Sequence, residues 1–204
     1  MSISRFLFVV FIFIIACSNS RSKFSSKNSP SHKIWDSLLK VHVEKTGLVN
    51  YSGFLEDSAI LNHYLSELSG KHPNDMWNKK EQLAYWINCY NAFTVKLILD
   101  NYPLKSIKDI KAGPDIPFIH SAWDIKFIEI EDQKYDLNNI EHGILRDQFD
   151  EPKIHFAINC ASISCPVLRN EAYIADKLED QLNDQTEGFL SDPTKNEIGT
   201  DRLV

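Results

Sequence analysis

Apolar residues recur every three or four positions along the chain after residue 33, which is the spacing of amphipathic helices. Two such series come first. Their members are Ile34, Leu38 and Val41 in the first series, and Leu61, Leu65 and Leu68 in the second. The second series predicts a helix over 55–68, and Gly70 is a suitable stop.

The longest helical pattern follows in the segment MWNKKEQLAYWINCYNAFTVKLILDNYP. Asn74 or Asp75 is a suitable N-cap, and we expect the helix to run to about Asp100, where Asn101 and Pro103 end it. Its second half is apolar on most of its circumference. A helix of this kind is expected to be central and buried.

The pattern changes to alternation in the middle of the chain. Residues 123–130, WDIKFIEI, predict a strand, EDQK predicts a turn, and Tyr135 leads into a second short strand. Asp136 or Asn138 then caps a helix that we expect to reach about Phe149.

Residues 153–159, KIHFAIN, alternate again and predict a third strand, and residues 172–190 return to helical spacing. The chain contains no internal repeat. We therefore predict an α+β fold: a helix-rich single domain with a small, mainly antiparallel sheet and a long central helix.

The N-terminus reads MSISRFLFVVFIFIIAC, in which Arg5 precedes a short apolar run. This pattern is typical of a signal peptide, here residues 1–16, and its end resembles the lipobox of bacterial lipoproteins. The resemblance implies cleavage before Cys17 and a diacylglycerol on its sulfur. Residues 17–33 are Ser-rich and predict a flexible tether, which leaves residues 34–204 for the folded domain.

These features predict the location and partners of the mature protein. The lipid on Cys17 would anchor the protein to a bacterial membrane in the cell envelope. In Gram-negative cells, Ser18 at the next position permits transfer to the outer membrane. The chain has a formal net charge of −6 and no basic stripe, so nucleic acid is not expected as a partner. No cofactor is expected.

Three cysteines remain once Cys17 carries lipid, and the simplest arrangement is one pair and one free thiol. Cys89 lies in the long helix, and Cys160 and Cys165 lie in a loop after the predicted third strand. Cys160 is a candidate nucleophile, since a thiolate at a strand end can attack a carbonyl. A Cys160–Cys165 disulfide is the competing interpretation. The spacing does not match a standard zinc site, and no metal is expected.

Two histidines and one carboxylate are candidate partners of the Cys160 thiolate. His142 lies at the edge of a helical stripe and is the candidate base, because an extended strand would hold His155 roughly 16 Å from Cys160. His155 is a second candidate, on the strand face opposite Ile154, Phe156 and Ile158, or a hydrogen-bonded residue buried by a helix. Glu141 is a candidate site residue, but Asn138-x-x-Glu141 also fits a capping box.

Asn88 and Asn91 lie three residues apart on one face of the long helix. Amides in an apolar helix are costly unless they are hydrogen-bonded. The two residues therefore either clamp the helix to the cysteine loop or orient a catalytic histidine, as in Cys-His-Asn sites.

Three segments in the same order, LAYWINCYNAFTVKLI, IEHGILR and IHFAINCASISCPVLRNEAY, resemble the DUF547 family of domains of unknown function. The resemblance covers residue 34 to the C-terminus and implies no mechanism. Members of that family continue past the last helix with an aromatic-rich segment. The end at NEIGTDRLV therefore raises the expectation of a truncated C-terminus.

Two functions remain open from the sequence. The first is an envelope-tethered, thiol-dependent hydrolase or acyl or peptidyl transferase, with Cys160 as nucleophile, His142 as base and Asn88 or Asn91 as orienting group. Its order of His before Cys is permuted relative to papain-like enzymes. The second is a non-catalytic binding or interaction module of the cell envelope that is stapled by Cys160–Cys165.

Overall fold

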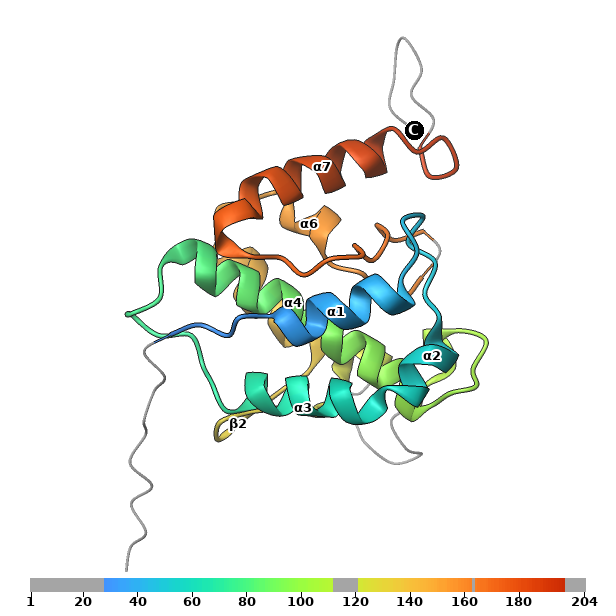
Figure 1. Ribbon diagram of the computed structural model, residues 1–204, viewed down its shortest axis with the longest axis horizontal. Helices are drawn as coiled ribbons and strands as arrows, with labels where there is room; N and C mark the ends of the chain where they lie inside the picture. Colours follow the sequence, from blue (N-terminus) through green and yellow to red (C-terminus); the bar gives the residue numbers. More distant parts are fainter. Residues whose placement is uncertain (1–27, 112–120, 163, 197–204) are drawn as a thin grey trace, which may run out of the picture.

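The computed structural model describes residues 28–111, 121–162 and 164–196 (Figure 1). The expected signal peptide, Cys17, most of the tether and the end of the C-terminus lie outside these residues. The main helices are α1 (Lys33–His42), α2 (Tyr51–Glu56), α3 (Ser58–Ser69), α4 (Lys79–Asp100), α5 (Arg146–Gln148), α6 (Ile154–Ala157) and α7 (Leu178–Leu190). Short 3-10 turns are η1 (Ile107–Asp109), η2 (Ala122–Asp124) and η4 (Ala175–Lys177), and η3 (Asn139–Leu145) is a π-helix.

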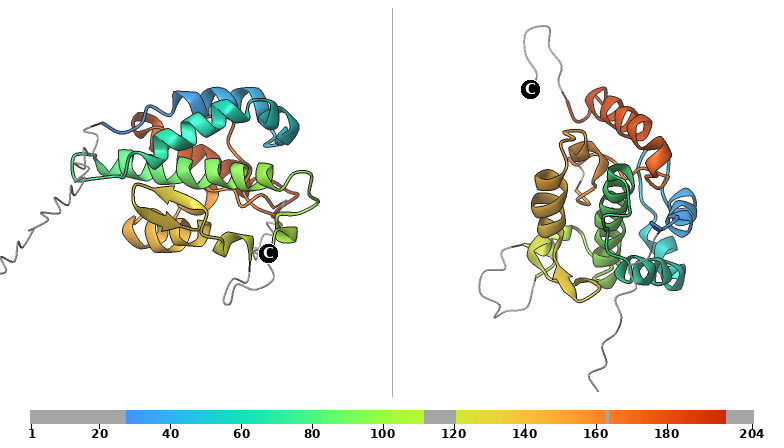
Figure 2. Two further views of the ribbon diagram at one scale, coloured as in Figure 1. Left: turned by 90° about the horizontal axis from the view of Figure 1, so that it is seen from below. Right: turned by 90° about the vertical axis from the view of Figure 1, so that its left-hand side faces the viewer.

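Helix α4 is the centre of the fold, as its apolar circumference predicts. It begins one turn later than expected, because Asn78 accepts a hydrogen bond from the Glu81 N–H and the Glu81 carboxylate accepts one from the Asn78 N–H. It ends at Asp100, as predicted. Helices α1 and α3 lie on one side of α4, and the β-hairpin and η3 lie on the other (Figure 2).

Helix α1 buries a different face from the one expected. Its buried residues are Trp35, Leu38, Leu39 and His42, whereas Val41 is 69% exposed. Trp35 decides the face, because its indole is fully buried and stacks on the ring of Tyr64 in α3.

The helix predicted over 55–68 corresponds to α3, and a separate short helix, α2, precedes it. Asn50 caps α2 by accepting from the Gly53 N–H, and Asp57 separates the helices. The turn before α2 needs Gly47, which has a φ of 83° and no room for a Cβ beside Val167.

The only sheet among the described residues is a two-stranded antiparallel hairpin of β1 (Ile128–Ile130) and β2 (Gln133–Tyr135). Ile128 and Ile130 face the core and Glu129 faces solvent, as the alternation predicts. The hairpin and the many helices confirm the predicted α+β, helix-rich single domain.

The predicted third strand, residues 153–159, is wrong: Ile154–Ala157 form the short helix α6. The same apolar residues suit both structures, since Ile154, Ala157 and Ile158 are buried at helical spacing while His155 is exposed. Short apolar runs do not separate helix from strand. Helix α6 packs against helix α7, whereas a strand at this position would have paired with the hairpin.

Helix α7 lies over α6 (Figure 1) and begins later than predicted, after the η4 turn. Two buried glutamines on α7 bond to backbone atoms of the preceding segment. The Gln181 amide binds Ala172 and Ile174, and the Gln185 side chain donates to the Val167 carbonyl at 2.7 Å. These bonds fix the chain between the cysteine loop and α7.

Candidate functional site

The sulfurs of Cys160 and Cys165 are joined in a disulfide, and the two Cα atoms lie 6.2 Å apart. The third cysteine of the domain, Cys89, is free and fully buried in α4. Burial raises the pKa of the Cys89 thiol, so it stays protonated. The bonded Cys160 carries no thiolate, and a nucleophilic role would first require reduction of the disulfide.

Hydrogen bonds hold the disulfide loop independently of the sulfurs. The Asn159 side chain donates to the Pro166 carbonyl at 2.7 Å and accepts from the Ala161 N–H at 3.0 Å. Ala161 is left-handed, with a φ of 57°. The Lys195 ammonium donates to the Cys165 carbonyl at 2.7 Å. These bonds hold the described residues at both ends of the loop.

Asn88 and Asn91 clamp the central helix to the backbone of distant segments. The Asn91 amide donates to the Ala157 carbonyl and accepts from the Asn159 N–H, both at 2.9 Å. The Asn88 amide binds Tyr173 in the same way, at 2.7 and 3.0 Å. All four of these hydrogen bonds go to backbone atoms, as expected if the two asparagines clamp the helix to other segments. Among the described residues, no hydrogen bond joins either amide to an imidazole.

A second polar cluster joins η3, α5 and α6 to the central helix α4. The Arg146 guanidinium donates to one Glu141 oxygen at 2.8 and 3.2 Å, and to the Nδ1 atom of His155 at 3.2 Å. The Tyr90 hydroxyl donates to the other Glu141 oxygen at 3.3 Å. Because arginine only donates, Nδ1 accepts and the neutral His155 ring carries its proton on Nε2.

Burial, followed by the negative charge of Glu141, raises the pKa of the Tyr90 hydroxyl. Tyr90 is therefore a protonated donor at physiological pH. The cluster opens toward solvent, since the side chains of Glu141 and Arg146 are 16% and 46% exposed. It can present a carboxylate, a guanidinium and an imidazole to a ligand, and its four side chains include no thiol.

The capping role considered for Glu141 is wrong. Asp136 caps this helix instead and accepts from the Asn139 N–H at 2.6 Å, while the Asn138 amide donates to the Asp124 carboxylate. Glu141 is thereby free to pair with Arg146. Glu141 and Arg146 lie five positions apart in the sequence, and the wider turn of a π-helix brings them together.

His142 is exposed on η3. In the part of the chain that the structure describes, no hydrogen bond or ring contact joins His142 to Cys160. The structure thus brings Glu141 and His155 together and leaves His142 and Cys160 outside their cluster. The bridging role of Arg146 could not be predicted from the sequence, because α-helical spacing does not pair residues five apart.

Within residues 28–111, 121–162 and 164–196, no group of three His, Cys, Asp or Glu residues is placed to hold a metal ion. No helix in these ranges is long and apolar enough to cross a membrane.

The family model described as "Protein of unknown function, DUF547" matches residues 74–190, which is more than half of the 204 residues. The chain belongs to the DUF547 family. The DUF547 match starts just before α4 and ends with the last residue of α7, so it includes both asparagine clamps, the polar cluster and the disulfide loop. Searches of curated proteins and of solved structures found no match.

Proposed function

We propose that this DUF547 protein is a lipid-anchored binding module of the bacterial cell envelope and that its Cys160–Cys165 disulfide is a structural staple. The disulfide is the observation that carries the proposal, because it occupies both loop sulfurs. Disulfides persist in oxidising compartments outside the cytosol. The apolar run that ends at Cys17 supports the same location.

A binding role is favoured over thiol catalysis by the surroundings of the sulfurs. A catalytic thiol needs a base within hydrogen-bond reach, and that base needs an orienting group. Among the described residues, the imidazoles of His142 and His155 make no hydrogen bond to either sulfur. Asn88 and Asn91 use their amides on backbone atoms.

The state of the cysteines is tested on the full chain as isolated. We expect the intact mass to rise by about 2 Da on reduction, because two thiols replace one disulfide. In the native protein, iodoacetamide should label Cys160 and Cys165 after reduction but not before it. Cys89 is buried and should stay unlabelled until the chain is unfolded. Labelling of Cys160 without reductant, faster than a peptide thiol, would replace this proposal by the thiol enzyme.

The lipid anchor is tested in cells. Cys17→Ala should abolish incorporation of labelled fatty acid and release the protein from the membrane fraction. Ser18→Ala is the matched control, since it leaves the acceptor sulfur in place and should keep the label. Equal membrane retention of both variants without any fatty-acid label would contradict the anchor.

A further inference from the structure

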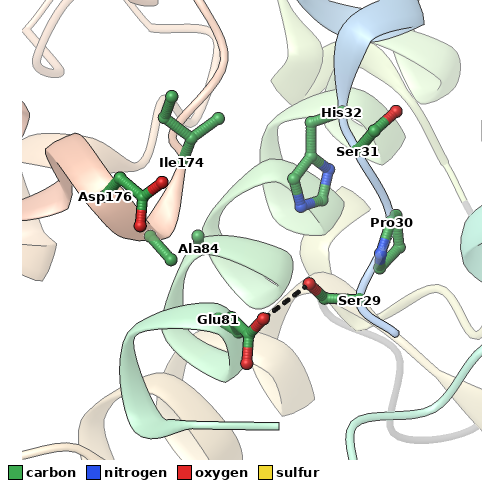
Figure 3. A pocket seen from close by; sticks show the side chains of 9 residues that line it. Ser29, Pro30, Ser31, His32, Glu81, Ala84, Ile174 and Asp176 are labelled. Carbon is green, nitrogen blue, oxygen red and sulfur yellow. Dashed lines mark hydrogen bonds between the residues drawn. The ribbon is translucent and has the colours of Figure 1, made fainter. Parts of the chain in front are cut away.

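A pocket of about 190 Å³ lies where the chain enters the folded domain (Figure 3). Residues 29–32 form one wall. Glu81 and Ala84, in the first turns of α4, form the floor. Residues 174–176 form the opposite wall. Three parts of the chain that are distant in sequence therefore converge on one small cavity.

Two carboxylates from different elements line this pocket. Glu81 accepts from the Ser29 hydroxyl at 3.2 Å and from the Asn78 N–H at 2.7 Å, and Asp176 is exposed on the opposite wall. Within the described ranges, neither carboxylate has an ion pair with lysine or arginine. Both carboxylates are therefore available to attract a cation.

His32 points into the same pocket from the wall that bears Ser29 (Figure 3). Its side chain is 5% exposed, and its Nδ1 atom lies 2.7 Å from the hydroxyl of the fully buried Tyr64. The Tyr64 hydroxyl proton has no other acceptor in the described structure, so Nδ1 accepts it and Nε2 carries the ring proton. Nε2 itself has no partner among the described residues.

Burial, together with the positive charge of Lys71, lowers the pKa of His32 to about 4. The imidazole is therefore neutral at physiological pH and adds no positive charge to the pocket. It offers one N–H donor beside two carboxylate acceptors.

We propose that this pocket binds a primary ammonium group with an oxygen acceptor on the neighbouring carbon skeleton. The ammonium group lies between Glu81 and Asp176, and the oxygen accepts from the Nε2–H of His32. Either an amino-terminal peptide residue or an amino sugar supplies this pair of groups. The inference rests on the proposed function as a binding module and names the class of its ligand.

The volume limits what enters the pocket. Its volume of about 190 Å³ is small beside the roughly 300 to 1,000 Å³ of typical ligand pockets. That space accommodates a single amino-carbonyl unit or one edge of a sugar ring. The remainder of a larger ligand lies outside.

The test is a ligand-observed NMR titration of the full chain in detergent with glycinamide, N-acetylglycinamide and D-glucosamine. We expect saturable binding of at least one of the two amines and none of N-acetylglycinamide, whose amine is blocked. Tighter binding of glycinamide would assign a peptide source, and tighter binding of glucosamine would assign a sugar source.

Asp176→Asn should weaken binding of the amine at least tenfold, and Glu81→Gln, which keeps an acceptor for the Asn78 N–H, should also weaken it. Asp180→Asn is the matched control, because Asp180 is an exposed acid in the first turn of α7 outside the pocket and should not change binding.

Three results would overturn the inference: no saturable binding of either amine, equal binding of N-acetylglycinamide, or equal affinities of the Asp176→Asn and Asp180→Asn variants. If one of these results is found while the disulfide is intact and its cysteines resist labelling, the proposed binding module stands but its ligand is not an amine. Labelling of Cys160 in the unreduced protein would defeat the proposed function whatever the pocket binds.

Discussion

Two polar networks adjoin the central helix α4, and they differ in their exposure to solvent. Asn88 and Asn91 are 0% and 2% exposed, and both bind backbone atoms. The network of Glu141 and Arg146 is built from charged side chains and is partly open to water. One network therefore joins segments of the fold, and the other presents charged groups at the surface.

The difference separates structure from recognition in this domain. A buried amide that loses its partners leaves backbone groups without hydrogen bonds, which is costly. An exposed ion pair exchanges its contacts for water at little cost. Loss of the first network should therefore destabilise the fold, whereas the second can change without unfolding the chain.

The largest expected effect comes from Asn91→Ala. The change leaves the Ala157 carbonyl and the Asn159 N–H without partners in the interior, so we expect the free energy of unfolding to fall by about 4 kcal/mol. Urea denaturation of the full chain measures it. Asn183→Ala is the control, since Asn183 only accepts from Lys153 at the surface and should cost less than about 0.5 kcal/mol. Equal losses in both variants would show that the buried hydrogen bonds of Asn91 contribute no more to stability than a surface contact.

The second test adds buried His32 to the comparison. The folded pKa of His32, about 4, lies below the ordinary histidine value of 6.5, so the unfolded chain binds more protons between these pH values. The stabilisation from a neutral His32 is complete above about pH 6.5 and is lost as the pH falls toward 4. Between pH 7 and pH 4.5 this contributes about 2 to 3 kcal/mol.

His32→Gln isolates the contribution of this histidine, because the carboxylates titrate alike in both proteins. Urea denaturation at the two pH values should show a smaller loss on acidification in the variant than in the wild type. Parallel losses would mean that His32 is protonated in the folded state, and the pocket would then be less suited to a cation.

Removal of the disulfide should have the third largest effect. The double variant Cys160→Ser, Cys165→Ser should lose about 2 kcal/mol, because the bond closes only a short loop. The hydrogen bonds of Asn159 and Lys195 should keep the loop folded. Reduced wild-type protein should have the same stability as the variant. A loss above about 5 kcal/mol would show that the loop depends on the bond rather than on its hydrogen bonds.

The sequence predicted the helices well where burial and local signals agree. The apolar circumference of α4 and the stop after Asp100 predicted its place and its end. The error at Ile154–Ala157 has a physical cause: four residues are too few to display a period, and the contacts with α7 and with Asn91 decide the conformation.

The candidate site was less predictable, because its geometry depends on long-range and irregular contacts. The sequence identified Glu141 and His155, but their link through Arg146 needs the π-helix and the turn that brings α6 beside it. His32 was missed entirely, since it was assigned to the tether. The nearby Trp35, which anchors the next turn, was the available signal that the fold begins earlier.

The smallest expected effect is that of Arg146→Gln, and it tests the open side of the comparison. The change removes the guanidinium from both Glu141 and His155 but leaves the Tyr90 hydroxyl to satisfy one Glu141 oxygen. Because the Arg146 side chain is nearly half exposed, we expect a loss of about 0.5 to 1 kcal/mol. A double-mutant cycle with Glu141→Gln in urea denaturation measures the coupling directly. A coupling above about 2 kcal/mol would place this cluster with the asparagine clamps, as part of the structure rather than a surface that is free to bind.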